Sequence, residues 1–596
     1  MAKPIYVLGT GTSHDGSSCL LKDGRICAAI EKERITRIKH DGGNDTEGIM
    51  YCLEKENIWL DDIDLIVQHT TTGQFAPGRV IDRNLRAPII TIPHHLAHAY
   101  SAYGASNFDE CAVFVLDGAG SPLCYCTDRM GEFILYSAPA PDGNERDYKE
   151  NNSYYHFERG KWRLICKEAS RVWHKVTDKR VRTFTENSIG NFYEWISTYC
   201  FRSFLDAGKL MGLAPYGNPL TYNEEAFVVR DGIMLLNQGI LEKFKDRSVS
   251  QAHFLKNFQY YADIANWAQR ELERAIVFLL NSRYEMCPSE NLAYCGGVAL
   301  NAVMNSKILE KSPFKRLYVQ PAAGDDGAAL GCAYYGWLEV MKKGRVFPES
   351  TTCFGKVYSS QSVKGALNKY LHSDPGKPEE KGIGQFESEN YLQYIHYEGE
   401  GYIDEAARLL SAGKILGWFQ DESEFGPRAL GRRSILADPR INGVRDFINA
   451  EIKHREDFRP FAPAVLREDL LIYFENDIES PYMLKVNQIK SNWKEKIKEI
   501  VHVDGSCRTQ TVTPDWNPKF HRLLQEFKKI TGLSVLLNTS FNGVSMPIVE
   551  TPEDAFQFFY SGKLDYLVIQ DIIVSRHASR QLKRGSVNVL SQSSRL

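Results

Sequence analysis

The chain has 596 residues, of which 43% are hydrophobic and 25% charged, a balance typical of a folded globular protein. This length exceeds what one hydrophobic core supports and predicts roughly three to four domain-sized units. The net charge of −3 gives no overall attraction for nucleic acid, and no apolar run is long enough to cross a bilayer, so we expect neither a nucleic-acid nor a membrane partner.

The cysteines and the first residues indicate a cytoplasmic protein. The sequence contains 13 cysteines but no CxxC pair. Cys111 and Cys295 lie in apolar segments, where a reduced, buried thiol is expected in place of a disulfide. The first residues, Met1–Pro4, have no signal-peptide character. We therefore expect a reduced protein in the cytoplasm.

The first predicted elements are short apolar strands joined by turns. Residues 5–8 form a strand that runs into a glycine-rich turn over residues 9–16. Residues 19–21 and 26–30 flank an Asp-Gly turn, which is a strong signal for a β-hairpin. The chain therefore begins with a strand, a turn of the size that suits a phosphate, and a hairpin.

A histidine pair follows at helical spacing. His94 and His98 are four residues apart, which on a helix places both imidazoles on one face, able to hold one metal ion. Asp117 ends the apolar strand over residues 111–116, and the glycines after it would let a phosphate approach the backbone. The alternative is a helix with two solvated histidines and an ordinary strand-to-turn aspartate.

The first pattern then recurs. Strands are predicted over residues 111–116, 123–126 and 133–136, with a glycine-bearing turn after the first of them. Two copies suggest a duplicated lobe with a cleft between the halves, which is the layout of the superfamily of actin, hexokinase and sugar kinases. Residues 140–186 are polar and charged with little periodicity, and we interpret them as an insertion.

Two further strand-to-helix turns resemble phosphate sites. A long amphipathic helix is predicted over residues 261–284. After it, the strand at 292–295 runs into Gly296-Gly297, and the strand at 317–320 runs into a loop that ends in Asp325-Asp326-Gly327. Small residues between a strand and a helix suit a phosphate at the helix N-terminus, although each turn alone could be ordinary.

The composition predicts how the chain divides into domains. The segment over residues 373–389 is polar and rich in turn residues, and a helix at 403–410 and strands at 414–419 and 534–537 follow it. The predicted units are a first domain over 1–350, a boundary region over 351–400, a second domain over 401–575 and a polar tail over 576–596.

A second chemical cluster lies in the later domain. Arg428, Arg432 and Arg433 surround one turn, and further cationic and polar residues follow among Phe, Pro, Leu and Gly. Such flanks indicate partial burial, and a partly buried cation without an anion is costly. We therefore favour an anion site over a basic surface that is paired with acidic neighbours. The other candidate residues are Lys453, Arg455, Arg459, Arg508, Ser540 and Asn542.

Together these segments resemble the family of nodulation and antibiotic O-carbamoyltransferases. The resemblance extends from residue 14 to residue 542 in the family's order, and its motifs are specific jointly although each is weak alone. The matching stretches are His14-Asp-Gly-Ser-Ser, Glu31-Lys-Glu-Arg-Ile-Thr-Arg37, His94-His-Leu-Ala-His98, Leu116-Asp-Gly, Gly208-Lys-Leu-Met-Gly-Leu-Ala-Pro-Tyr-Gly217, Gly296-Gly-Val-Ala-Leu-Asn301, Glu424-Phe-Gly-Pro-Arg-Ala-Leu-Gly431, Lys453-His-Arg-Glu-Asp-Phe-Arg-Pro-Phe-Ala-Pro463 and Asn538-Thr-Ser-Phe-Asn542.

For the later domain, the resemblance implies an α/β fold like that of threonylcarbamoyl-adenylate synthase. It would convert carbamoyl phosphate and ATP, with Mg, into carbamoyl-adenylate. Lys453 and Arg428 would be catalytic. Arg455, Arg459, Arg508, Ser540 and Asn542 would bind the substrates.

For the first domain, the resemblance implies a duplicated, ribonuclease H-like actin fold that transfers the carbamoyl group to an acceptor hydroxyl and releases AMP. The metal ligands would be His94, His98, Asp117 and Asp325. Asp325 is preferred to Asp326 because it lies six residues before Gly331, as in the family. Family usage favours Fe(II), with Zn or Mn as alternatives for this donor set. The resemblance also implies nucleotide contacts from Gly118, Lys209, Gly296, Gly297 and Asn301.

His14 would be the general base on the acceptor hydroxyl, because it falls on the family's Phe-His-Asp position and an imidazole has a pKa near neutrality. The expected acceptor is a small polyhydroxylated natural product, and a homodimer is expected from family habit. An ATP-dependent small-molecule kinase is the alternative enzyme, but it leaves the second anion site unexplained. A maturation scaffold is the non-enzymatic alternative, and it would need cysteine pairs that the sequence lacks.

Overall fold

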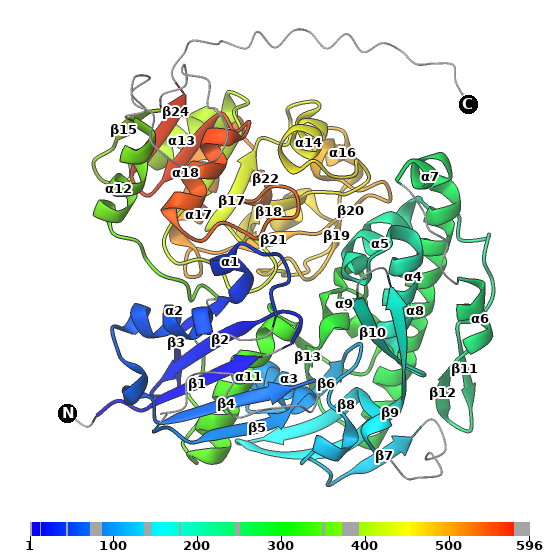
Figure 1. The fold of residues 1–596 in the computed structure, drawn as a ribbon. Coiled ribbons are helices and arrows are strands. Elements are labelled where there is room, and N and C mark those ends of the chain that lie inside the picture. The colour runs from blue at the N-terminus through cyan, green and yellow to red at the C-terminus, as the bar shows by residue number, and fades with distance from the viewer. Residues whose placement is uncertain are drawn as a thin grey trace.

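The computed structural model describes residues 3–11, 13–42, 46–71, 86–135, 145–177, 180–244, 251–348, 352–371 and 392–576. The fold is mixed α/β, and within these residues it contains three large β-sheets with helices packed on them (Figure 1). No helix within these ranges combines the length and the apolar character that a membrane crossing requires. The segment over 373–389 lies outside the described residues, as does the tail predicted over 576–596 except for its first residue, Arg576, which ends a strand.

The first sheet contains the predicted N-terminal hairpin. Its order is β3-β2-β1-β4-β5, with β1, β2 and β3 antiparallel and β4 and β5 parallel to β1. Asp23 and Gly24 have φ of 49° and 85° at the hairpin turn, where an Asp-Gly pair is favoured. The strands are β1 (Tyr6–Gly11), β2 (Ser17–Lys22), β3 (Arg25–Glu31), β4 (Leu65–Thr70) and β5 (Ile89–Pro93).

The second sheet repeats this topology. Its path β9-β8-β6-β13-β14 has the same order of antiparallel and parallel neighbours as the first sheet, with β10 and β7 added along β9. The repetition that the sequence suggested is therefore present. The strands are β6 (Glu110–Leu116), β7 (Glu132–Leu135), β8 (Tyr148–Glu158), β9 (Lys161–Thr177), β10 (Arg180–Thr185), β13 (Asn291–Cys295) and β14 (Arg316–Val319).

Two predictions about this repeat were wrong. Residues 123–126 do not form the second strand, because Leu123–Tyr125 is a short 3-10 turn. The segment over 140–186 is not an insertion, since β8 and β9 within it form the second hairpin of the sheet. Its polar appearance misled the prediction because Lys167 and Glu150 are fully buried and neutralise each other inside the sheet.

Two helices of small residues lie between the two sheets (Figure 1). They are α3 (His94–Ala105) and α11 (Ala328–Tyr335), which share one core with strands of both sheets. A Cβ on Gly331 would lie 1.7 Å from the Ala97 carbonyl oxygen, so only glycine permits this crossing. The close packing fixes the face of α3 that carries His94 and His98 relative to the loop before α11.

The outer face of the second sheet is covered by α8 (Phe258–Met286) and α4 (Ile189–Phe201), which share a second core. The predicted helix at 261–284 lies within α8. Smaller elements of this half are α1 (Lys32–Thr36), α2 (Thr46–Glu56), α5 (Ala207–Leu213), β11 (Phe227–Arg230), β12 (Ile233–Leu236), α6 (Gln238–Lys243), α7 (Gln251–Lys256), α9 (Ala302–Asn305) and α10 (Ile308–Lys311).

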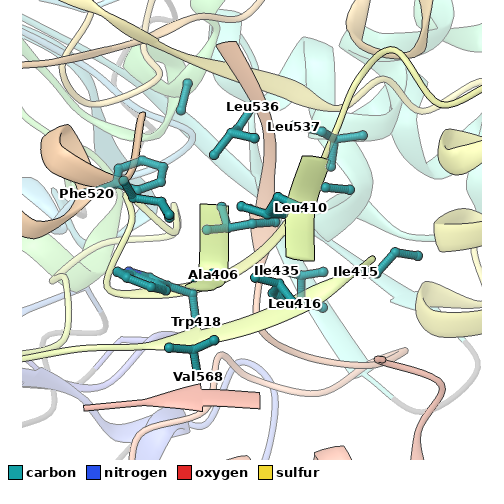
Figure 2. Close-up of a cluster of buried hydrophobic side chains, with 14 of the residues drawn as sticks. Ala406, Leu410, Ile415, Leu416, Trp418, Ile435, Phe520, Leu536, Leu537 and Val568 are labelled. Atoms are coloured by element: carbon teal, nitrogen blue, oxygen red, sulfur yellow. The ribbon is translucent and has the colours of Figure 1, made fainter. Parts of the chain in front are cut away.

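The third sheet forms the C-terminal part, in the order β15-β24-β23-β16-β17-β22-β18-β21. Helices α13 (Gly401–Ser411) and α17 (Pro518–Thr531) contact each other and bury Leu410 and Phe520 against it (Figure 2). The strands are β15 (Leu392–His396), β16 (Leu416–Phe419), β17 (Arg433–Ala437), β18 (Ala462–Leu466), β21 (Gln510–Val512), β22 (Val535–Ser540), β23 (Tyr566–Ile569) and β24 (Ile572–Arg576).

The helix predicted at 403–410 lies within α13, and the predicted strands at 414–419 and 534–537 overlap β16 and β22. The remaining C-terminal elements are α12 (Ser360–Leu371), α14 (Val444–Phe447), α15 (Leu470–Tyr473), α16 (Ser491–Lys494), α18 (Pro552–Ser561) and the strand pair β19 (Asn487–Gln488) and β20 (Ser506–Cys507).

Candidate functional site

Four side chains from three separate parts of the chain meet between the first two sheets. One ligand atom from each of His94, His98, Asp117 and Asp325 lies within 4.8 Å of the others. The Nε2 atom of His94 is 3.2 Å from Asp117 Oδ2 and 3.3 Å from Asp325 Oδ1, and His98 Nε2 is 3.0 Å from His94 Nε2. We call these four residues the His-Asp cluster.

Strand ends place the members of the cluster. Helix α3 begins at His94 directly after β5, Asp117 follows β6, and Asp325 lies in the loop after β14. These strands run parallel to a neighbour in their sheets, so the residues that follow their carboxyl ends come together at the cluster. The histidine pair that the spacing predicted on one helical face is therefore next to both predicted carboxylates.

The predicted glycines Gly296 and Gly297 support Asp117. The Gly297 N–H donates to Asp117 Oδ1 at 3.1 Å. Gly296 has φ of 90°, and a Cβ there would lie 2.1 Å from the Leu116 carbonyl oxygen, so this approach requires glycine. Gly118 packs against the side chains of Asn191 and Glu194, and a Cβ on Gly118 would lie 3.0–3.4 Å from their polar atoms.

The charges of the cluster fit a divalent cation. Burial alone would lower the pKa of His94, but Asp325 and Asp117 outweigh burial and raise it to about 10. The carboxylates thus attract positive charge strongly to the point where the imidazole nitrogens converge. Two imidazole nitrogens and two carboxylate oxygens in a buried site suit Fe, Zn or Mn.

One buried histidine behind the cluster was missed from the sequence. His69 Nδ1 lies 3.0 Å from His94 Nδ1, on the side of the ring away from the carboxylates. Burial lowers the pKa of His69 well below its usual range, and the neighbouring His94 lowers it further. A neutral His69 can therefore accept the His94 Nδ1–H and leave His94 Nε2 free to bind metal. The available signal was a histidine at the end of a parallel strand, β4.

His14 faces the cluster from the open side. Its Nε2 is 3.6 Å from Asp325 Oδ2, its Nδ1 is 3.0 Å from Asp15 Oδ2, and its side chain is 46% exposed. His40 Nδ1 contacts the other Asp15 oxygen at 2.8 Å. Burial opposes ionisation of Asp15, but hydrogen bonds from His14 and His40 outweigh it and lower the pKa of Asp15. Asp15 and His40 were not among the predicted site residues, although Asp15 follows His14 in its motif.

A buried ionic network holds the start of α3. The Ser121 Oγ accepts from the His94 N–H at 2.9 Å, and Glu150 Oε2 accepts from the Ser121 N–H at 2.8 Å. Glu150 and Asp128 both pair with Lys167, and all three side chains are fully buried. The network thus ties the loop after Asp117 to His94, the first residue of α3.

A second site lies where the C-terminal part meets the first part. A cavity of about 280 Å³ is lined from the first part by Gly208, Gly212 and Ala302 and from the C-terminal part by basic and polar residues. The latter include the predicted residues Arg428, Arg455, Arg459, Arg508, Ser540 and Asn542. We call this the basic cavity.

The arginines of the basic cavity depress one another's pKa. Burial, and then Arg459, lower the pKa of Arg428 to about 10 and that of Arg455 to about 9. Burial also lowers the pKa of Arg508, together with the charges of Arg428, Arg455 and Arg459. Burying several like charges together is costly unless an anion neutralises them. The cavity therefore suits a strongly anionic ligand, which supports the anion-site interpretation of this cluster.

Lys453 lies beside the basic cavity and donates hydrogen bonds to two residues that line it. Its Nζ donates to Ser540 Oγ at 3.1 Å and to Asn542 Oδ1 at 2.6 Å. Burial, and then the charges of Arg455 and Arg459, lower its pKa well below the usual range. The structure thus brings together the predicted Lys453, Ser540 and Asn542.

Other predicted residues lie at the margin or elsewhere. Lys209 pairs with Asp206 at 3.1 Å and Glu456 at 2.9 Å. The Asn301 amide oxygen caps α9, and its Nδ2 donates to Gln269 at 2.9 Å. Arg432 pairs with Asp421, and Arg433 lies over the Phe419 ring, so neither lines the cavity.

Comparison with known proteins matches most of the chain to one family. The sequence model described as "Carbamoyltransferase N-terminus" matches residues 6–77 and 74–334. The model described as "Carbamoyltransferase C-terminus" matches residues 407–576.

Two named relatives and one solved structure are similar to this chain. Nodulation protein NolNO of Sinorhizobium fredii is 30% identical over 608 residues, covering 95% of this chain and 79% of that protein. The 3'-hydroxymethylcephem-O-carbamoyltransferase of Amycolatopsis lactamdurans is 30% identical over 372 residues, covering 61% of this chain and 64% of that enzyme. HypF in its phosphate- and nucleotide-bound form is 14% identical over 56% of each chain, with a TM-score of 0.35.

Proposed function

Because the chain belongs to the carbamoyltransferase family and is an O-carbamoyltransferase, we propose that its two sites carry out successive half-reactions. The basic cavity makes carbamoyl-adenylate from carbamoyl phosphate and ATP with Mg. The His-Asp cluster then receives it and transfers the carbamoyl group to a hydroxyl of a small polyhydroxylated natural product. The observation that carries this proposal is the set of buried arginines in the cavity, which suits a polyphosphate.

The first half-reaction needs a free carboxylate oxygen. Water displaces phosphate from carbamoyl phosphate and leaves carbamate, whose oxygen then attacks the α-phosphorus of ATP while pyrophosphate departs. Negative charge builds on the phosphoryl oxygens in this step, and fixed cations stabilise it. Lys453 and Arg428 would act on the reacting phosphate, while Arg455, Arg459, Arg508, Ser540 and Asn542 would hold the rest of the anion.

The second half-reaction joins the acceptor oxygen to the carbamoyl carbon and breaks that carbon's bond to AMP. His14 takes the hydroxyl proton on Nε2, and Asp15 stabilises the imidazolium through Nδ1. A metal held by His94, His98, Asp117 and Asp325 would polarise the carbamoyl carbonyl when bound. We propose Fe(II), with Zn or Mn as alternatives.

The departing AMP is assigned to the glycine turns beside Asp117. Gly118, Gly296 and Gly297 carry no side chain, so a phosphate could approach their backbone closely. Lys209 and Asn301 are proposed at its margin, where Lys209 would have to leave Glu456 to reach a nucleotide.

The finer fold assignment is part of the proposal. The repeated strand order supports a duplicated actin-like domain over residues 1–350, and the C-terminal sheet supports a domain like threonylcarbamoyl-adenylate synthase over 401–575. Residues 351–400 would connect them. We also propose a cytoplasmic enzyme that forms a homodimer. A kinase reaction has no observation in its favour, since it would leave the basic cavity without a role.

The nucleotide product tests the proposal. The protein is incubated with Mg-ATP and carbamoyl phosphate, and the nucleotides are separated by chromatography. AMP and pyrophosphate support carbamoyl-adenylate formation. ADP together with a phosphorylated compound would show a kinase and contradict the proposal.

A further inference from the structure

One short segment of the first part touches both sites. The connecting segment, residues 31–42, begins at the end of β3 and contains α1. Within this segment, Glu31 and Arg34 both form hydrogen bonds with the backbone of Gly426, in the C-terminal part. The Gly426 N–H donates to Glu31, and Arg34 Nη2 donates to the Gly426 carbonyl at 2.6 Å. Gly426 is two residues before Arg428, which lines the basic cavity.

Arg37 forms hydrogen bonds with a second loop, residues 542–548, which begins at the cavity-lining Asn542. It ends α1 in a left-handed conformation and donates to the Pro547 and Ile548 carbonyls at 2.9 Å and 2.6 Å. It also pairs with Asp554 at 3.4 Å. At the start of this loop, Asn542 binds Lys453, and its amide donates to the Met546 carbonyl at 2.6 Å.

The other side of the connecting segment holds the His14 loop. The Lys32 N–H donates to the Gly16 carbonyl at 2.8 Å, and the Gly16 N–H donates to the Asp41 carbonyl at 3.0 Å. His40 contacts Asp15, and Lys39 lines the basic cavity. The segment therefore contacts the His14 loop on one side and two loops of the basic cavity on the other.

From these contacts we infer that Glu31, Arg34 and Arg37 are positioning residues that keep the basic cavity aligned with the His14 side of the cluster, so that carbamoyl-adenylate passes between the sites without escaping. The inference rests on the proposed function. Carbamoyl-adenylate is a mixed anhydride, and water attacking its carbamoyl carbon yields carbamate and AMP. Each escape would therefore consume one ATP without product.

Arg37→Ala tests this inference, because Arg37 is partly exposed and its loss leaves no buried unpaired charge. Arg37→Lys keeps the charge but replaces the planar fork, whose two Nη atoms each reach one carbonyl, with a single nitrogen. The control is Arg274→Ala, since Arg274 also binds a backbone carbonyl, that of Phe227, and a carboxylate, that of Glu271, but wholly within the first part.

Three quantities are measured without any acceptor, using Mg-ATP and carbon-labelled carbamoyl phosphate: ATP–pyrophosphate exchange, AMP formation, and label that stays with the protein through rapid gel filtration. In Arg37→Ala we expect AMP formation about tenfold faster, most retained label lost, and exchange within about twofold of wild type, because charge-assisted hydrogen bonds are removed only between the sites. Arg37→Lys should be intermediate and Arg274→Ala unchanged.

The possible results distinguish a failure of the positioning role of Arg37 from a failure of the proposed carbamoyl-adenylate synthesis. If the wild-type protein exchanges pyrophosphate but Arg37→Ala matches it in AMP formation and retained label, the positioning role is overturned and the proposed function stands. Loss of exchange in Arg37→Ala at an unchanged melting temperature would place Arg37 in adenylate formation and also overturn it. Absence of ATP–pyrophosphate exchange in the wild-type protein would contradict both the proposed function and the positioning role.

Discussion

His14 and Asp325 come from different repeats of the first part and face each other, with 3.6 Å between His14 Nε2 and Asp325 Oδ2. His14 follows the first strand of one sheet, and Asp325 follows the last strand of the other. An exposed imidazole at the mouth of a buried donor cluster is well placed to take a proton from an entering hydroxyl.

His14→Asn should keep its metal and still make carbamoyl-adenylate, but transfer should be at least about a hundredfold slower, because general-base catalysis contributes about 10²–10⁴-fold. Transfer is measured with a small hydroxyl compound that the wild-type protein carbamoylates, and metal by elemental analysis. If His14→Asn loses the metal, His14 belongs to the ligand set, and unimpaired transfer would remove it from the mechanism.

Removing the metal should separate the two half-reactions. Asp117→Ala, or chelation of the wild type followed by return of Mg alone, should abolish carbamoyl transfer and leave ATP–pyrophosphate exchange in place, because Lys453 and the arginines of the cavity lie in another part of the chain. His94→Ala and His98→Ala should behave in the same way. Full-rate transfer by a metal-free sample would contradict the four-ligand site.

His69→Leu should weaken metal binding by about 10–100-fold, because a partner that orients a ligating imidazole typically contributes this much. The readout is the dissociation constant for Co(II) as a spectroscopic probe. His95→Leu is the matched control, since His95 is equally buried but contacts Ser153. Equal affinities in the two variants would show that His69 only fills space.

Lys167→Met should destabilise the first part of the chain by about 3–5 kcal/mol, because Glu150 and Asp128 would be left buried without a countercharge. Chemical denaturation followed by tryptophan fluorescence measures the change. Lys243→Met removes an exposed pair with Glu224 and should cost no more than about 1 kcal/mol. A similar loss in both variants would argue against the buried network.

Local sequence patterns were sufficient wherever one short segment carries the information. The spacing of His94 and His98 predicts a shared helical face, and the Asp23-Gly24 pair predicts the first hairpin. Patterns failed where tertiary pairing decides the structure. The sequences of β8 and β9 contain charged residues and so look like a surface segment, but Lys167 and Glu150 are buried and neutralise each other within the sheet. The position of His69 behind His94 depends on how β4 pairs with β5.

Contacts between distant segments were beyond such patterns as well. Nothing local to Arg37 indicates that it binds carbonyls about five hundred residues later in the chain, at Pro547 and Ile548. The anion site could be proposed from the sequence because Arg428 and Arg459 have Pro, Leu or Phe as close neighbours, which is a signal of burial. Which arginines share the basic cavity is decided by the fold: Arg428 and Arg508 line it, and Arg432 does not.

The central claim is that Lys453 and the surrounding arginines make carbamoyl-adenylate, and incorporation of labelled pyrophosphate into ATP tests it most directly. The wild-type protein should catalyse this exchange when carbamoyl phosphate is present. Lys453→Ala should lose at least about a hundredfold, since removing one group that stabilises developing charge typically costs about 10²–10³. Lys528→Ala, which removes a surface lysine paired with Asp469, should exchange normally. Normal exchange by Lys453→Ala, with its metal content unchanged, would contradict the account.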